Sequence, residues 1–172
     1  MPNTFELIAS STVGSGGASE INFSSIPSTF TDLSLRLSLR TSYSGIADDL
    51  YLKFNNSTAA NYSFRTLLAN GSTVRSQAAS GQTLLYCAGI NAATSTSSTF
   101  SNIDIYIPNY AGSTNKSVSV DNVIENNATT ADLGFLGNLW SQTAAINQIT
   151  LLGGYAALVQ YSTAYLYGVK NA

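Results

Sequence analysis

The sequence predicts an all-β protein, a sandwich or barrel of about ten short antiparallel strands. Three observations predict this fold: one segment with strictly alternating leucines, a series of short strand-like segments separated by turn residues, and almost no helical periodicity. The alternating segment is Thr31–Ser42 (TDLSLRLSLRTS), in which every second residue from 33 to 39 is leucine. In an extended chain the leucines share one face and the Ser/Arg row shares the other, as in an antiparallel sheet that covers a core on one side only.

Further strand-like segments lie on both sides of this one in the first half of the chain. Thr4–Ser11 alternates, and Glu20–Phe23 is a short strand that follows a glycine-rich turn. Leu50–Phe54 alternates in the same way as the leucine segment. Tyr62–Ala69 and Ser72–Gln77 flank an Asn-Gly pair, which is preferred in type I′ turns because both central residues need positive φ. We therefore expect a hairpin with this turn.

The second half of the chain continues the pattern. Thr83–Ile90 is nearly continuously apolar, which suits a strand covered on both faces. Asn91–Thr99 is a polar, low-complexity loop, long enough to be mobile or to contact a partner. The only helical candidate is Ser141–Ala145, about one turn at most. The remaining strands are expected at Phe100–Ile107, Lys116–Glu125, Leu133–Trp140, Ile146–Leu152 and Ser162–Val169.

Composition limits the number of domains and the classes of partner. The 172 residues suit a single domain over residues 1–172, because neither a linker nor an internal repeat is present. Only 9% of residues are charged, against about 25% in typical soluble proteins, so we expect a polar surface or one that other subunits cover. The Lys and Arg residues are scattered, which argues against nucleic-acid binding. Neither a signal peptide nor a membrane span is expected, because the sequence lacks the apolar runs that they need.

Residues that carry chemistry are scarce. The absence of histidine removes Ser-His-Asp and Cys-His catalysis and histidine zinc sites. Cys87, the single cysteine, is expected to be a small buried hydrophobe in a chain folded in a reducing cytoplasm. Asp48 and Asp49 are expected in a solvated turn. Four other carboxylates are the remote candidates for the pair that a glycosidase needs: Asp104, Asp121, Glu125 and Asp132. The sequence therefore predicts no catalytic residue, cofactor or metal site, and a protein that is not an enzyme.

Two groups of side chains are candidates for contact with a partner. Arg36 and Arg40 belong to the solvent face of the leucine strand, where they pair with carboxylates of a neighbouring subunit or are solvated. Tyrosine is favoured at interfaces and sugar-binding platforms, although cross-strand packing is its ordinary role in a sheet. Trp140 precedes four tyrosines that crowd the C-terminal region: Tyr155, Tyr161, Tyr165 and Tyr167.

Three segments resemble a group of small structural proteins of tailed bacteriophages. They are INFSSIPSTFTDLSLRLSLRTS (Ile21–Ser42), LYLKFNNSTAANYSFRTL (Leu50–Leu67) and INQITLLGGYAALVQYSTAYLYGV (Ile146–Val169). The segments carry fold patterns and no catalytic motif. The resemblance implies a virion component with an antiparallel, jelly-roll-like β-sandwich. Some proteins of this kind decorate or cement the capsid, often as trimers, and others belong to tails or fibres.

We therefore expect a capsid decoration protein, made in the host cytoplasm and bound to the major capsid protein on the capsid surface as a homotrimer. The expected contact residues are Pro2, Asn3 and Phe5 in the N-terminal segment, Thr94 and Ser95 in the Asn91–Thr99 loop, and Arg36, Arg40, Tyr155 and Tyr161. The alternative is a tail-fibre or receptor-binding module that recognises a host glycan through Trp140 and the tyrosines.

Overall fold

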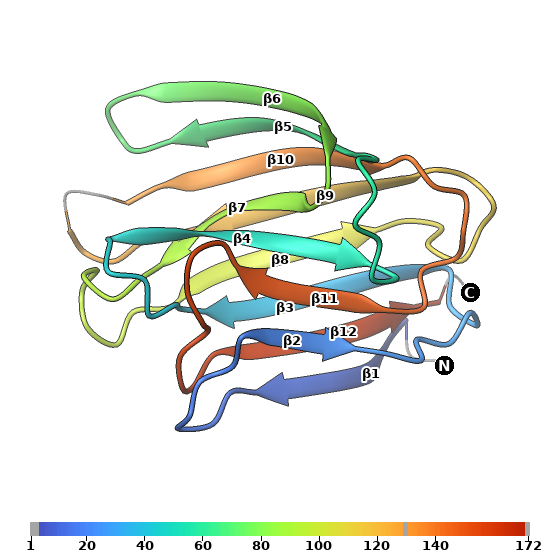
Figure 1. Ribbon diagram of the computed structural model, residues 1–172, viewed down its shortest axis with the longest axis horizontal. Helices are drawn as coiled ribbons and strands as arrows, with labels where there is room; N and C mark the ends of the chain where they lie inside the picture. Colours follow the sequence, from blue (N-terminus) through green and yellow to red (C-terminus); the bar gives the residue numbers. More distant parts are fainter. Residues whose placement is uncertain (1–3, 129–130, 171–172) are drawn as a thin grey trace.

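The computed structural model describes residues 4–128 and 131–170, which form twelve strands and no helix. One sheet has eight strands, in spatial order β1 (Phe5–Thr12), β12 (Thr163–Val169), β3 (Asp32–Leu39), β8 (Ser101–Ile107), β9 (Lys116–Val123), β10 (Leu133–Trp140), β5 (Tyr62–Ala69) and β6 (Val74–Gln82). The other has four, in the order β2 (Glu20–Phe23), β11 (Ile149–Gly153), β4 (Ala47–Phe54) and β7 (Leu85–Asn91). Figure 1 shows the two sheets lying face to face.

The predicted antiparallel sandwich is confirmed, with twelve strands in place of about ten. All the strand pairs are antiparallel. The first and last strands interleave as in a jelly roll, because β12 lies between β1 and β3, and β11 lies between β2 and β4. The Ser141–Ala145 segment is a connection between β10 and β11, so the predicted helical turn is wrong.

The leucine strand is β3, and its leucines face the core as predicted. Leu33, Leu35 and Leu39 are fully buried. Leu35 is directly opposite Ile105 of β8 and Leu166 of β12, so the alternation continues across neighbouring strands. Burying each such side chain contributes about 1.5–3 kcal/mol. The apolar layer between the two sheets is therefore the main source of stability.

The predicted hairpin is confirmed, but the predicted turn type is wrong. β5 and β6 are joined by a four-residue turn, Asn70–Thr73, in which Gly71 has positive φ and Asn70 does not. The Asn70 side-chain oxygen accepts the backbone N–H groups of Ser72 (3.1 Å) and Thr73 (2.8 Å). Asn therefore closes the turn through its side chain, which is a second reason for its frequency in turns.

Asp48 and Asp49 lie inside β4, so their predicted position in a solvated turn is also wrong. Asp48 is buried, and its Oδ1 accepts the backbone N–H groups of Asp49 (2.7 Å) and Tyr155 (3.1 Å). Asp49 points to the opposite side of the strand and is half-buried. The first carboxylate orders a loop, and the second is available on the outer side of the small sheet.

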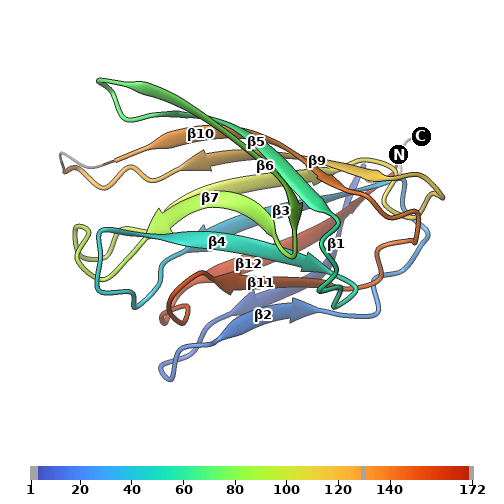
Figure 2. The same cartoon turned by 45° about the horizontal axis from the view of Figure 1, so that its top comes forward.

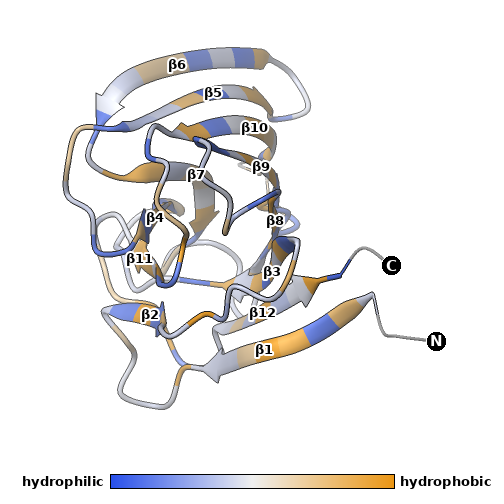
Figure 3. Ribbon diagram, turned by 90° about the vertical axis from the view of Figure 1, so that its right-hand side faces the viewer, coloured by the Kyte–Doolittle hydropathy of each residue, from blue (hydrophilic) through white to orange (hydrophobic). Residues whose placement is uncertain are grey.

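The small sheet covers only part of the large sheet. Its last strand, β7, packs against β9, β10 and β5. The β5–β6 hairpin extends beyond the edge of the small sheet, as Figures 1 and 2 show. Viewed along the strands, the same hairpin curves over β7 (Figure 3). The overhang lies on the same side of the large sheet as the small sheet, and hollows lie between the hairpin and β4 and β7.

Candidate functional site

The outer face of the large sheet carries an apolar strip over its last four strands, β9, β10, β5 and β6. Alternation along β10 buries Gly134, Leu136 and Trp140 and leaves Leu133 and Phe135 exposed to solvent. We define the apolar strip as five large side chains with exposed fractions between 41% and 71%: Leu67, Val74, Val123, Leu133 and Phe135.

Strand register makes the apolar strip contiguous. Leu133 is directly opposite Val123 of β9, and Phe135 is directly opposite Leu67 of β5. Directly opposed side chains in an antiparallel pair have Cβ atoms about 4.5–5.5 Å apart. Val74 extends the strip onto the edge strand β6. Contiguous exposed apolar side chains of this kind are typical of interaction surfaces.

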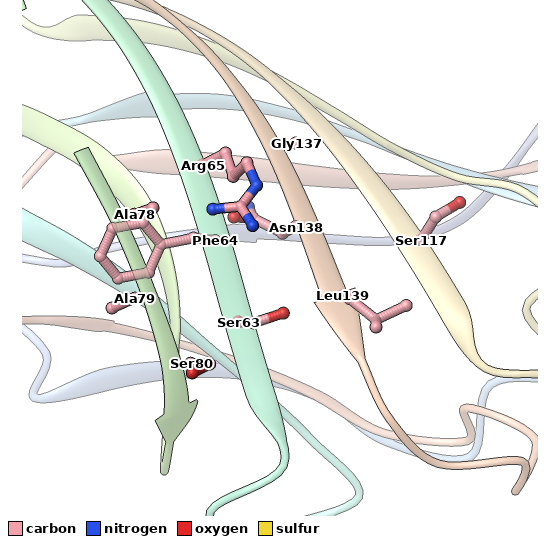
Figure 4. A pocket seen from close by; sticks show the side chains of 10 residues that line it. All are labelled: Ser63, Phe64, Arg65, Ala78, Ala79, Ser80, Ser117, Gly137, Asn138 and Leu139. Carbon is pink, nitrogen blue, oxygen red and sulfur yellow. The ribbon is translucent and has the colours of Figure 1, made fainter. Parts of the chain in front are cut away.

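A shallow hollow of about 570 Å³ continues the strip along the same face of β5 and β10 (Figure 4). Gly137 occupies an outward position of β10 directly opposite Arg65 of β5. A Cβ atom added at Gly137 would meet nothing within 4 Å, so the glycine leaves open space beside the arginine. Ala78 and Ser117 line the hollow with similarly small side chains. The hollow can therefore admit side chains of a partner that covers the apolar strip.

Most of the lysine and arginine side chains are either paired with carboxylates or buried. Three form ion pairs: Arg36 with Asp104 (3.6 Å), Arg75 with Asp132 (2.7 Å) and Lys170 with Glu6 (2.8 Å). Buried Lys116 donates to the carbonyl oxygens of Gly112 (2.6 Å) and Thr143 (3.4 Å). Arg36, which we expected to contact a partner, is exposed but is already paired within the chain.

Arg40 is not on the solvent face, which corrects its expected role as a contact residue. Its side chain is buried and its guanidinium donates to the carbonyl oxygens of Ala93 (3.3 Å), Ser95 (3.0 Å), Thr96 (2.9 Å) and Thr99 (2.8 Å). The alternation of β3 ends at Leu39, because Arg40 leaves the large sheet and forms a bridge to Asn91 at the end of β7. Arg40 thus organises the predicted contact loop from inside.

The Asn91–Thr99 loop is correspondingly ordered by internal hydrogen bonds. Ser95 is buried and its hydroxyl donates to the Ala92 carbonyl oxygen (2.8 Å), so the expected contact at Ser95 is wrong. Thr94 is exposed, and its backbone N–H donates to the Gly45 carbonyl oxygen (3.1 Å). The loop therefore packs against the β3–β4 connection and offers Thr94 at its surface.

The remaining expected contact residues lie at opposite ends of the sandwich. Tyr155 and Tyr161 are exposed in the β11–β12 connection, and the Tyr155 ring lies 5.2 Å from that of Tyr43. Phe5 is exposed at the start of β1, at the end where both termini lie (Figure 1). Pro2 and Asn3 lie outside the described residues. The structure thus joins Tyr155 to the Thr94 loop through the β3–β4 connection, but separates both from Phe5.

Trp140 cannot present its ring to a glycan, which corrects one residue of the alternative interpretation. It is 2% exposed and lies between Phe54 (ring centroids 5.4 Å apart) and Tyr62 (6.2 Å apart) in the core. Tyr165 is exposed on the outer face of β12, and Tyr167 is half-buried two residues further on. A sugar platform that combines Trp140 with these tyrosines is therefore excluded by geometry.

The described residues include no group of three or more His, Cys, Asp or Glu side chains placed to hold a metal ion. Asp104 is directly opposite Asp121 on the outer face, so these two carboxylates are neighbours as the sequence allowed. Cys87 is fully buried, as predicted, and burial raises the pKa of its thiol. Within the same residues, no helix is long and apolar enough to cross a membrane.

Sequence reasoning did not identify the apolar strip, although a signal was present. In LGFLGNLW (Leu133–Trp140), both alternating sets contain large apolar residues. Trp140 and Leu136 form one set, and Leu133 and Phe135 form the other. A strand that is apolar on both faces in a weakly charged protein indicates either burial on both faces or an exposed contact surface.

Comparison with known proteins does not assign the chain to a family. No protein-family model matches the chain, and no curated protein matches it. Among solved structures, the chain is similar to galectin LEC-6 of Caenorhabditis elegans, at 9% sequence identity and a TM-score of 0.35, over 94% of this chain and 96% of that one. A similarity at this level carries no functional argument.

Proposed function

We propose that this protein is a capsid decoration protein of a tailed bacteriophage, which binds the major capsid protein through the apolar strip and has no catalytic activity. The apolar strip is the observation that carries the proposal. It lies on a regular sheet, so its backbone is already ordered before a partner binds and docking loses little backbone entropy. The resemblance of three segments to phage structural proteins supplies the class of partner.

Decoration would stabilise the capsid by mass action. A protein that binds the assembled lattice, and not its separated subunits, stabilises the lattice by its binding free energy. A weakly charged surface suits this role, because charge is depleted at the centre of protein interfaces. A homotrimer remains part of the proposal. Edge strand β6, which pairs on one side only with β5, is an available surface for its contacts.

The first test determines whether the protein is part of the virion and in how many copies. Virions purified from the phage that encodes the chain are analysed by quantitative mass spectrometry, with the major capsid protein as internal reference. A copy number that matches a symmetric set of capsid positions supports the proposal. Absence from the virion, or a copy number of a few per particle as expected for a tail fibre, would overturn it.

The second test determines whether the apolar strip is the surface that binds the capsid. Purified protein is mixed with capsids that lack it and sedimented, and bound protein is quantified. Leu67→Ser combined with Phe135→Ser should abolish saturable binding, whereas Ile46→Ser should bind as the natural chain does. Ile46 is the matched control because it is 41% exposed and lies in the β3–β4 connection, outside the four strands that carry the apolar strip. Undiminished binding of the double variant would show that the docking surface lies elsewhere.

A further inference from the structure

The overhang of β5 and β6 creates a groove that is separate from the apolar strip. Its floor is the outer side of the small sheet, where Asp49 and Tyr51 of β4 lie beside Tyr86 of β7. Its wall is formed by Phe64 of β5 and Gln77 of β6. The resulting hollow has a volume of about 360 Å³. We call it the overhang groove.

Three aromatic rings in the overhang groove are fixed by one another. The Tyr86 ring lies 5.8 Å from that of Tyr51 and 5.2 Å from that of Phe64, with both pairs tilted. All three side chains are only partly buried. Partly exposed rings that are held in place offer apolar faces on which the C–H groups of a ligand can pack.

Hydrogen-bonding groups of both kinds lie beside these rings. The Tyr51 hydroxyl donates to Asp49 Oδ2 (3.3 Å). Gln77 lines the same hollow from β6 and adds an amide, which both donates and accepts. The groove thus combines ring faces with a carboxylate, an amide and a phenol.

A second hollow, of about 190 Å³, adjoins the 360 Å³ hollow and shares Asp49, Gln77 and Tyr86 with it, and we include it in the overhang groove. Asn122 lines this part and is 2% exposed. Its amide nitrogen donates to the Gly89 carbonyl oxygen (2.7 Å), but its Oδ1 has no partner among the described residues. Asp132 pairs with Arg75 through Oδ2, while its Oδ1 is also buried without a partner. Buried acceptors without donors are costly, so they favour a ligand that supplies O–H groups.

We propose that the overhang groove binds a neutral saccharide. A sugar presents C–H groups on the face of its ring and hydroxyl donors around its rim, which matches aromatic rings flanked by unpaired oxygen acceptors. The groove disfavours phosphate, sulfate and acidic sugars, because Asp49 and Asp132 line it and its one arginine, Arg75, is already paired. The proposal is independent of capsid docking, since the apolar strip lies on the opposite face of the large sheet.

The test uses the full chain on an array of neutral, sialylated and sulfated oligosaccharides, with titration calorimetry on the neutral sugars that bind. Asp49→Asn and Tyr51→Ala should each weaken binding by about tenfold or more while keeping the thermal midpoint within a few degrees. Tyr161→Ala, which removes an exposed tyrosine elsewhere, should bind as the natural chain does.

Several outcomes would overturn the proposal: no array sugar binds, only acidic sugars bind, or the Asp49 and Tyr51 variants bind at full affinity. If both variants unfold, backbone NMR shifts of the natural chain on titration with the same sugar decide. Shifts in β4, β6 and β7 support the overhang groove, and shifts confined to other elements refute it.

Discussion

Replacing Arg40 by methionine should destabilise the protein far more than the same change at Arg36, although both arginines come from one alternating segment. Methionine keeps most of the side-chain volume and removes the guanidinium. The Asn91–Thr99 loop then loses donors to four backbone carbonyl oxygens, those of residues 93, 95, 96 and 99. A hydrogen bond to a charged group contributes about 1.5–3 kcal/mol. The sum is not additive, because one buried charge serves all four oxygens and its own desolvation is costly.

We therefore expect Arg40→Met to lower the free energy of unfolding by about 3 kcal/mol, which corresponds to roughly 6–12 °C in thermal midpoint for a chain of this size. Arg36→Met removes a solvent-exposed ion pair and should cost about 0–1 kcal/mol. Circular dichroism melts measure both variants. Hydrogen exchange of the Ala93 and Thr94 amides, which donate to Tyr43 and Gly45, reports loop opening directly. Equal melts for the two variants, with unchanged exchange at these amides, would refute the role given to Arg40.

Three other predictions follow from burial, ionisation and the expected N-terminal contact. Burial raises the pKa of Tyr51 to about 12, and the hydrogen bond to Asp32 raises that of Tyr106 to about 12, from about 10 in an unfolded chain. The stabilisation that comes from the protonated Tyr51 and Tyr106 hydroxyls should therefore be complete below pH 10 and be lost between about pH 10 and 12. Tyrosinate absorbance that rises with a single midpoint near pH 10 would contradict this prediction. Cys87 should react with a thiol reagent only as fast as the chain unfolds, and rapid labelling under native conditions would show that its burial is wrong. Deleting residues 1–5 should weaken capsid binding in the sedimentation assay, and undiminished binding would remove the N-terminal segment from the contact surface.

The sequence was sufficient to predict the fold because side-chain alternation reports directly on extended structure. Each predicted strand overlaps an observed one, and the leucines of β3 face the core as expected. What alternation cannot show is where a strand leaves its sheet. Alternation places Arg40 on the same face as Arg36. In the structure, however, Arg40 lies where the chain crosses from one sheet toward the other, and its side chain points into a loop. The role of Arg40 therefore depended on tertiary geometry.

The candidate sites were harder to predict for the same reason. Alternation places Phe135 and Trp140 on opposite faces of β10 but does not say which of them faces the core, since both sets contain large apolar side chains. The overhang groove combines Asp49, Phe64 and Tyr86 from three strands, and it exists only because the two sheets differ in width. A local sequence pattern does not show how many strands each sheet contains, so it cannot predict that one sheet extends beyond the other.

The interleaving of the chain ends has a consequence for biosynthesis. β12 fills the position between β1 and β3, and β11 fills the one between β2 and β4. While these last strands are still inside the ribosome, both sheets have an open slot flanked by apolar side chains of β3 and β4. Neither sheet can be completed until β11 and β12 have left the ribosome, so the pairings of β3 with β12 and of β4 with β11 form after the pairings within the preceding strands become possible.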